Sequence, residues 1–139
     1  MNTTTIPTQA DHTKTGRDTI LLMSRILLAA LFVMAGVNKL SSVEGTIGYI
    51  ASVGLPLPEL VYMGTLALEI GAGLMLAIGL QTRFAAIALG VFSIAAALIF
   101  HSNFADPNEI TAFLKNLAIG GGMFALATAG SGRFGIQRS

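Results

Sequence analysis

Four long apolar segments, separated by short polar connections, are the feature that most limits how this chain can fold. They cover residues 20–40, about 58–80, about 84–101 and about 107–129. Each holds about 17–23 residues, and a helix of that length, rising ~1.5 Å per residue, crosses a ~30 Å hydrocarbon core. Membrane strands would instead alternate apolar and polar residues over about ten positions, and these segments do not. The sequence therefore predicts an all-α integral membrane protein, a four-helix bundle.

The composition agrees with a membrane location. Of the 139 residues, 53% are hydrophobic and 11% are charged, whereas a soluble domain carries about 25% charged residues. The length suits one domain. The net charge is +1, and no basic block accompanies it, so nucleic acid is not an expected partner. Membrane lipid is the expected surrounding.

Cysteine is absent from the chain. This excludes disulfides, thiolate nucleophiles and iron–sulfur ligation within it. Imidazole can come only from His12, in the polar N-terminal region, and His101, at the end of the third apolar segment. We therefore predict no metal site and no covalently bound cofactor.

Polar regions flank and divide the predicted membrane domain, residues 20–130. Residues 1–19 are polar and rich in Thr, and we expect a disordered tail there. Residues 131–139 form a second polar tail. Residues 41–57 are too polar to span, but apolar residues recur there at helical spacing. They predict a short interfacial helix between the first and second membrane helices.

The last connection carries a helix-start pattern. Asp106, Pro107 and Glu109 read as an N-cap, a proline at the first helical position and a capping-box Glu. Small residues, including Gly71, Gly73 and the run at 120–122, predict close helix packing.

Lys and Arg in the short loops predict the orientation, because cytoplasmic loops carry the excess of these residues. The two tails and the hairpin at 81–83 contain Lys14, Arg17, Arg83, Arg133 and Arg138. The connections at 41–57 and 102–109 contain neither Lys nor Arg. We expect a multi-pass protein of the bacterial inner membrane with both termini in the cytoplasm.

Ionisable residues within the spans are the candidates for function, because such groups are costly in hydrocarbon and usually face the bundle interior. Glu69 lies about 11 residues from either end of its segment, too deep to reach water. Arg25 and Lys39 share one face of the first helix with Phe32 and Gly36. Either cation is a possible partner of Glu69.

Further polar residues fall in the outer half of the predicted bundle. Asn38 and Lys39 end the first helix, His101 ends the third, and Lys115 and Asn116 lie inside the fourth. Arg25, Lys39 and Lys115 give the membrane region more cations than its single carboxylate balances. An excess of buried cations needs carbonyl oxygens, water or an anionic or carbonyl-bearing ligand.

These residues also have purely structural interpretations. Glu69 and a cation can form an ion pair without function, lysines near helix ends can extend to water, and His101 can be an interfacial hydrogen-bonding residue. Both interpretations remain open from the sequence. The candidate pocket consists of Arg25, Asn38, Lys39, Glu69, His101, Lys115 and Asn116, with no catalytic residue assigned.

Several motifs together resemble the DoxX family of small four-helix bacterial membrane proteins. They are RILLAALFVMAGVNKL, GLPLPELV, LEIGAGLMLAIGLQTRFAA, FHSNF and FLKNLAIGGGMFALATAG, within residues 20–135. The resemblance implies an inner-membrane protein associated with quinone-linked or thiol-linked redox complexes. It implies a quinone as ligand, held by Lys and Asn donors, and a partner redox protein or a second copy of the chain.

Three functions stay open at this stage. The first is a quinone-interacting component, such as an oxidoreductase subunit, whose thiol chemistry depends on a partner because this chain lacks cysteine. The second is a non-enzymatic assembly or scaffold subunit of a membrane complex. The third is a small transporter, which the lack of a repeat between the two halves disfavours.

Overall fold

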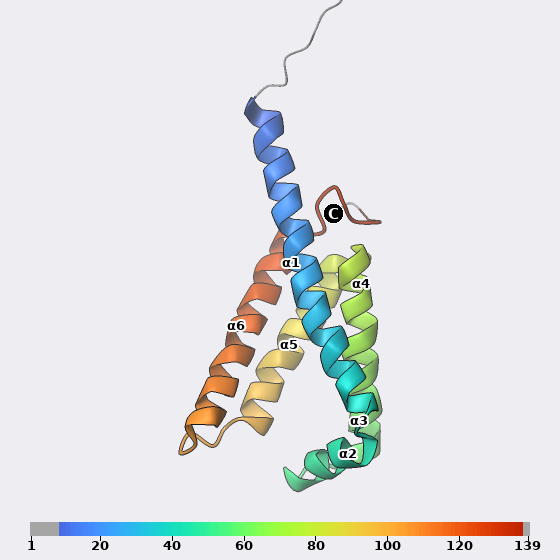
Figure 1. The fold of residues 1–139 in the computed structure, drawn as a ribbon, viewed down its shortest axis with the longest axis vertical. Helices are drawn as coiled ribbons and strands as arrows, with labels where there is room; N and C mark the ends of the chain where they lie inside the picture. Colours follow the sequence, from blue (N-terminus) through green and yellow to red (C-terminus); the bar gives the residue numbers. More distant parts are fainter. Residues whose placement is uncertain (1–8, 138–139) are drawn as a thin grey trace, which may run out of the picture.

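The computed structural model describes residues 9–137 of the chain, and every regular element in that range is a helix (Figure 1). The elements follow in the order α1 (Gln9–Leu40), α2 (Val43–Ser52), α3 (Pro58–Leu66), η1 (Ala67–Ala72), α4 (Gly73–Ile78), α5 (Thr82–Phe100) and α6 (Pro107–Ala129). The element η1 is a π-helical segment. It joins α3 and α4 into one rod, Pro58–Ile78.

Four helices are long and apolar enough to cross a membrane: α1, the rod Pro58–Ile78, α5 and α6. Many large apolar side chains, such as Leu27, Met34 and Leu98, point outward and are exposed. In water this surface would be costly, whereas in a bilayer it faces lipid. The structure thus confirms the predicted all-α bundle with four spanning helices and a short helix, α2, between the first two.

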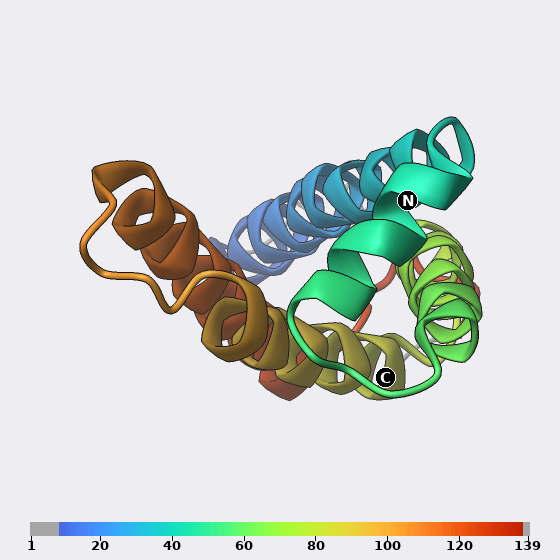
Figure 2. The same cartoon turned by 90° about the horizontal axis from the view of Figure 1, so that it is seen from below.

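The bundle has two distinct ends. The start of α1, residues 131–137 and the α4–α5 turn lie at one end, which we call the terminal end (Figure 1). The short helix α2 and the α5–α6 connection lie at the other, the α2 end. Seen from the α2 end, α2 lies across the space between α1, α3 and α5, and α6 lies outermost beside α5 (Figure 2). The helix α6 packs mainly on α5 and much less on α1.

The apolar core lies in the terminal half of the bundle. Leu76, Leu89 and Met123 are fully buried there in a continuous apolar cluster. Phe32 is the member of this cluster that also borders the hollow α2 half. The cluster therefore holds the helices together in the terminal half, although a groove of about 530 Å³ between α1 and α6 also lies there, bordered by Leu21, Leu28 and Leu126.

The first helix begins earlier than the sequence predicted. The polar region 1–19 was expected to be disordered, but α1 starts at Gln9; residues 1–8 lie outside the described residues. Thr15 and Thr19 donate their hydroxyls to the carbonyls of Asp11 and Thr15, one helical turn earlier, at 3.0 and 2.9 Å. The hydroxyls are satisfied within the helix, so the polar sequence continues the apolar helix without a break.

The other helix boundaries are close to the prediction, and two local details differ. The second spanning helix ends at Ile78 because Gly79 adopts a left-handed conformation with φ of 74°. The N-cap at Asp106 forms, with its side chain accepting from Asn108 N at 2.9 Å. The predicted capping-box role of Glu109 is wrong, since this carboxylate binds the nearby His101 instead.

Close helix packing is confirmed at some of the predicted glycines only. A Cβ on Gly73 would lie 2.9 Å from Val33 Cγ2 of α1, and one on Gly36 would lie 2.5 Å from Ile70 Cγ1 of η1. These two glycines therefore allow α1 to approach the rod closely. By contrast, a Cβ on Gly71 would meet nothing within 4 Å.

The segment 131–137, here called the C-terminal strap, folds back over the terminal end. The amides of Ile136 and Gln137 donate to the carbonyls of Ile78 and Gly79 at 3.1 and 3.2 Å. The side chain of Gln137 accepts from the amide of Gln81 at 3.0 Å. The strap thus satisfies free backbone groups at the end of α4 and the start of α5. The rest of the predicted C-terminal tail, residues 138–139, lies outside the described residues.

Candidate functional site

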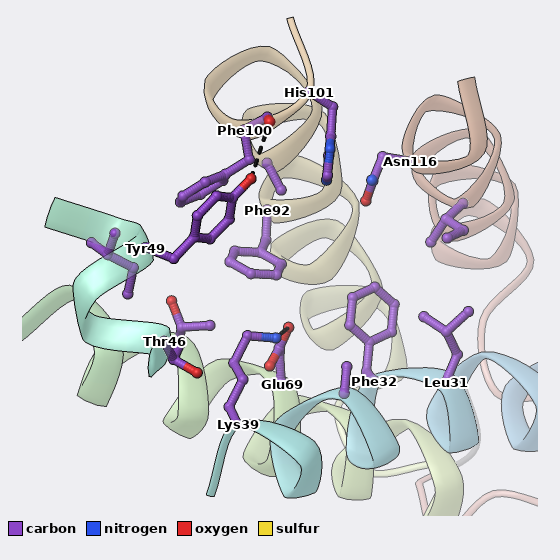
Figure 3. Close-up of a pocket in the computed structure, with 15 residues that line it drawn as sticks. Leu31, Phe32, Lys39, Thr46, Tyr49, Glu69, Phe92, Phe100, His101 and Asn116 are labelled. Atoms are coloured by element: carbon purple, nitrogen blue, oxygen red, sulfur yellow. Dashed lines mark hydrogen bonds and ion pairs between the residues drawn. The ribbon is translucent and has the colours of Figure 1, made fainter. Parts of the chain in front are cut away.

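A cavity of about 290 Å³ lies in the α2 half of the bundle, between α1, α2, η1, α5 and α6 (Figure 3). Most of its wall is apolar, and its aromatic side chains come from three helices. The polar lining is small and comes from different elements: Lys39, Thr46, Tyr49, Thr65, Glu69, His101 and Asn116. Such a mostly apolar cavity with a few convergent polar groups is typical of a small-molecule site.

Lys39 and Glu69 form the polar centre of the cavity. Lys39 Nζ lies 2.9 Å from Glu69 Oε1, and the two side chains are 29% and 4% exposed. Lys39 is in the last turn of α1, whereas Glu69 lies in the π-helical turn of the facing rod. Lys39 is further fixed through its backbone, because the buried Tyr62 donates its hydroxyl to the Lys39 carbonyl at 3.2 Å.

The choice between Arg25 and Lys39 as partner of Glu69 is settled by the geometry: the ion pair is Lys39–Glu69. Arg25 shares the predicted face of α1 with Phe32 and Gly36, and all three are buried. Its guanidinium, however, lies at the terminal end, where Nη2 donates to the Phe134 carbonyl at 3.3 Å. Arg25 therefore binds the C-terminal strap and is not among the cavity's lining residues.

His101 and Asn116 lie at the rim of the cavity, as the sequence predicted for the outer group. His101 Nδ1 is 3.0 Å from Glu109 Oε2, and both side chains are partly exposed. Asn116 donates from Nδ2 to the carbonyl of Ala112 in its own helix at 3.0 Å. The pair His101–Glu109 joins the end of α5 to the first turn of α6, so it fixes the two helices that carry one wall.

Asn38 and Lys115 are placed differently from the other candidates. Both side chains are exposed, and neither is among the residues that line the cavity. Asn38, like Val37, lies on the exposed face of α1, whereas the neighbouring Lys39 points toward the cavity. Of the seven candidates, four therefore meet at one cavity: Lys39, Glu69, His101 and Asn116. Their role as a ligand site is still a prediction.

The aromatic walls were not included in the sequence-based candidates. Phe92 and Phe100 project from α5, and Tyr49 comes from α2 (Figure 3). Tyr49 donates its hydroxyl to the Phe100 carbonyl at 3.3 Å, and the two rings lie 5.4 Å apart. The spacing Phe92, Ala96, Phe100 places all three on one face of a helix and is the signal that identifies this wall.

The π-helical turn was also not expected, and it contains the central carboxylate. A π turn inserts extra backbone into a helix and is frequent at functional sites. Here it lies against Gly36, whose missing side chain leaves room for Ile70 and Glu69. The insertion and the glycine together bring Glu69 toward the last turn of α1.

One oxygen of this carboxylate has no partner. Glu69 Oε2 is buried and accepts no hydrogen bond within the described residues. A buried acceptor without a donor is unfavourable. The ion pair therefore leaves one carboxylate oxygen enclosed by protein without a hydrogen-bond donor.

Four apolar spanning helices define the class of protein: a multi-pass helical membrane protein. The DoxX family model matches residues 20–102, and the chain belongs to the DoxX family. It is 38% identical over 124 residues to the inner membrane protein YqjF of Escherichia coli K12, covering 87% of this chain and 92% of YqjF.

A second relative supports the same placement. The inner membrane protein YphA of Escherichia coli K12 is 30% identical over 128 residues, which cover 88% of this chain and 91% of YphA. No solved structure matches the chain. Family, relatives and apolar helices together identify a multi-pass inner membrane protein.

Proposed function

We propose that this protein is a quinone-interacting component of a membrane redox system, with the quinone head group in the cavity beside Lys39 and Glu69. The observation that carries the proposal is the Lys39–Glu69 ion pair, which lines a mostly apolar cavity of about 290 Å³ with aromatic walls. That volume falls at the lower end of the range for small-molecule pockets. It is suited to a single substituted ring.

The chemistry of the lining fits such a head group. Phe32, Phe92 and Phe100 offer flat apolar surfaces to a ring. Lys39 Nζ has three N–H donors, and Glu69 is its one acceptor among the described residues, so a donor is left for a carbonyl oxygen. The chain supplies binding and orientation in this proposal, and electrons pass to or from a partner redox protein.

Titration with ubiquinone-1, a short-chain quinone, tests the proposal on the purified full chain in lipid nanodiscs. We expect saturable binding, and at least a tenfold loss of affinity in Ala96→Trp, because a large side chain at this lining position fills the cavity. The matched control is Ala118→Trp, at an exposed position of α6, which should bind as the parent does.

No saturable binding by the parent protein would contradict the proposal and favour an assembly subunit. Equal affinities in Ala96→Trp and Ala118→Trp would show that the quinone binds elsewhere, at the lipid-facing surface.

We also propose that both termini face the cytoplasm, so that the cavity lies in the outer half of the membrane. The support is the distribution of Lys and Arg: Arg83 and Arg133 lie at the terminal end, and the connections at the α2 end have neither residue. A green fluorescent protein fused to the C-terminus should fluoresce, since it matures in the cytoplasm. Activity of an alkaline phosphatase fused at the same site would reverse the orientation.

A further inference from the structure

Thr65 contributes to the cavity a hydroxyl group that a ligand can reach. It lies near the end of α3, about one helical turn before Glu69, and lines the same cavity. The residue is only partly buried, its hydroxyl has no hydrogen-bond partner within residues 9–137, and its oxygen is not among the enclosed unpartnered atoms. Glu69 Oε2, by contrast, is enclosed by protein. Of these two groups without a partner, the Thr65 hydroxyl is therefore the one open to the cavity.

This free hydroxyl is unusual in the chain, because threonine in a helix commonly donates to a backbone carbonyl one turn earlier. Thr46 donates to the Ser42 carbonyl at 2.7 Å, and Thr111 donates to the Pro107 carbonyl at 3.0 Å. The same kind of bond forms at Thr13, Thr15, Thr19 and Thr128. Thr65 also follows a turn of helix, yet it makes no such bond. Its O–H is thus available to donate to a ligand.

A second free donor lies on the same side of the cavity. Lys39 Nζ is bound to Glu69 Oε1, about one helical turn from Thr65 along the rod, and its other N–H groups have no acceptor within the described residues. Other polar groups of the lining are held by contacts of their own, as at Tyr49, His101 and Asn116. Lys39 and Thr65 therefore form a pair of donors that together suit two oxygen acceptors at neighbouring positions of one ligand.

We infer that Thr65 is a specificity-determining residue of the cavity, which donates its hydroxyl to a ring oxygen adjacent to the carbonyl that accepts from Lys39. The cavity therefore favours a quinone with alkoxy oxygens beside its carbonyls over a quinone with carbon substituents only. The latter leaves the Thr65 hydroxyl without a partner once the ligand has displaced water. This inference rests on the proposed function, because it specifies the class of quinone that the same cavity binds.

The test compares two quinones by calorimetry on the full chain in lipid nanodiscs. One is ubiquinone-1, and the other is its analogue in which methyl groups replace both methoxy groups. Both keep the carbonyls for Lys39, and only ubiquinone-1 offers a neighbouring oxygen to Thr65. Ubiquinone-1 should bind about fivefold more tightly, the value expected for one hydrogen bond between neutral groups.

Three variants assign this preference to one hydroxyl. Thr65→Val keeps the shape of the side chain and removes the O–H, so it should weaken ubiquinone-1 alone and reduce the preference to within about twofold. Thr65→Ser keeps the hydroxyl and should keep the preference. The matched control is Thr46→Val, which makes the same change in the same cavity, where the hydroxyl already donates to the Ser42 carbonyl. This control should keep the full preference.

Failure of the inference and failure of the proposed function give different results. If both quinones bind the parent protein in the cavity with equal affinity, the inference is wrong and the proposed function stands. A full preference in Thr65→Val, or the same loss in Thr46→Val, would also overturn the inference, since the discrimination would then come from another feature of the cavity. If neither quinone binds, the proposed function fails and the inference fails with it.

Discussion

Lys39→Met is expected to destabilise the protein by about 1–3 kcal/mol, the range for leaving a buried acceptor without its hydrogen-bond partner. The variant leaves the carboxylate of Glu69 buried at 4% exposure with no cation beside it. Equilibrium unfolding in mixed micelles of mild detergent and dodecyl sulfate measures the change. The cost arises from the carboxyl group left without its partner, because Met retains most of the apolar volume of the Lys side chain.

A double variant separates the ion pair from simple packing. Lys39→Met combined with Glu69→Met should recover most of the lost stability, since apolar replacement of a whole buried pair is often neutral or stabilising. Lys14→Met, at an exposed position near the start of α1, should change stability by less than about 0.5 kcal/mol. Equal stabilities of Lys39→Met and Lys14→Met would show that the pair is not buried as described.

Gly79→Ala is expected to destabilise by about 2–5 kcal/mol, through two effects that add at one position. Gly79 has φ of 74°, and a left-handed conformation costs a residue with a Cβ about 1–2 kcal/mol. The new Cβ would also overlap Arg25 Nη1 and the Cα of Gly135, and overpacking costs about 1–3 kcal/mol. Thermal unfolding in detergent should show a clear drop in Tm.

Gly64→Ala provides the matched control for this substitution. Gly64 lies inside α3, and a Cβ there would meet nothing within 4 Å. Alanine should therefore be neutral or stabilise the helix by up to about 1 kcal/mol. A Tm for Gly79→Ala at or above that of Gly64→Ala would mean that Arg25 and the C-terminal strap do not close over the α4–α5 turn.

Local features of the sequence predict most of the fold. Apolar length identifies all four spanning helices, and the Asp106–Pro107 pattern places the start of α6 at the observed residue. The helical period puts Arg25, Phe32 and Gly36 on the buried face of α1. These predictions succeed because each depends on residues within one helix. The extension of α1 to Gln9 was missed, since composition alone does not show that Thr hydroxyls bond within the helix.

Contacts between helices limit the prediction of the site. Sequence spacing identifies Glu69 as a deep carboxylate, but the choice of Lys39 as its partner depends on how α1 crosses η1. The π-helical turn that carries Glu69 depends on the same packing. Lys115 lies on the exposed side of α6, although the excess of positive charge suggested that it faced inward. The rotation of each helix about its own axis decides which residues meet across the cavity. Local sequence patterns constrain that rotation only weakly.

The binding of a quinone between Phe32, Phe92 and Glu69 is the central claim, and a crystal structure with a bromine-substituted ubiquinone analogue tests it most directly. Anomalous scattering from bromine locates the ring without relying on the fit of its density. The account predicts one strong bromine peak inside the cavity, next to the Lys39–Glu69 pair. Peaks confined to the lipid-facing surface of the helices, with the cavity free of bromine, would contradict it.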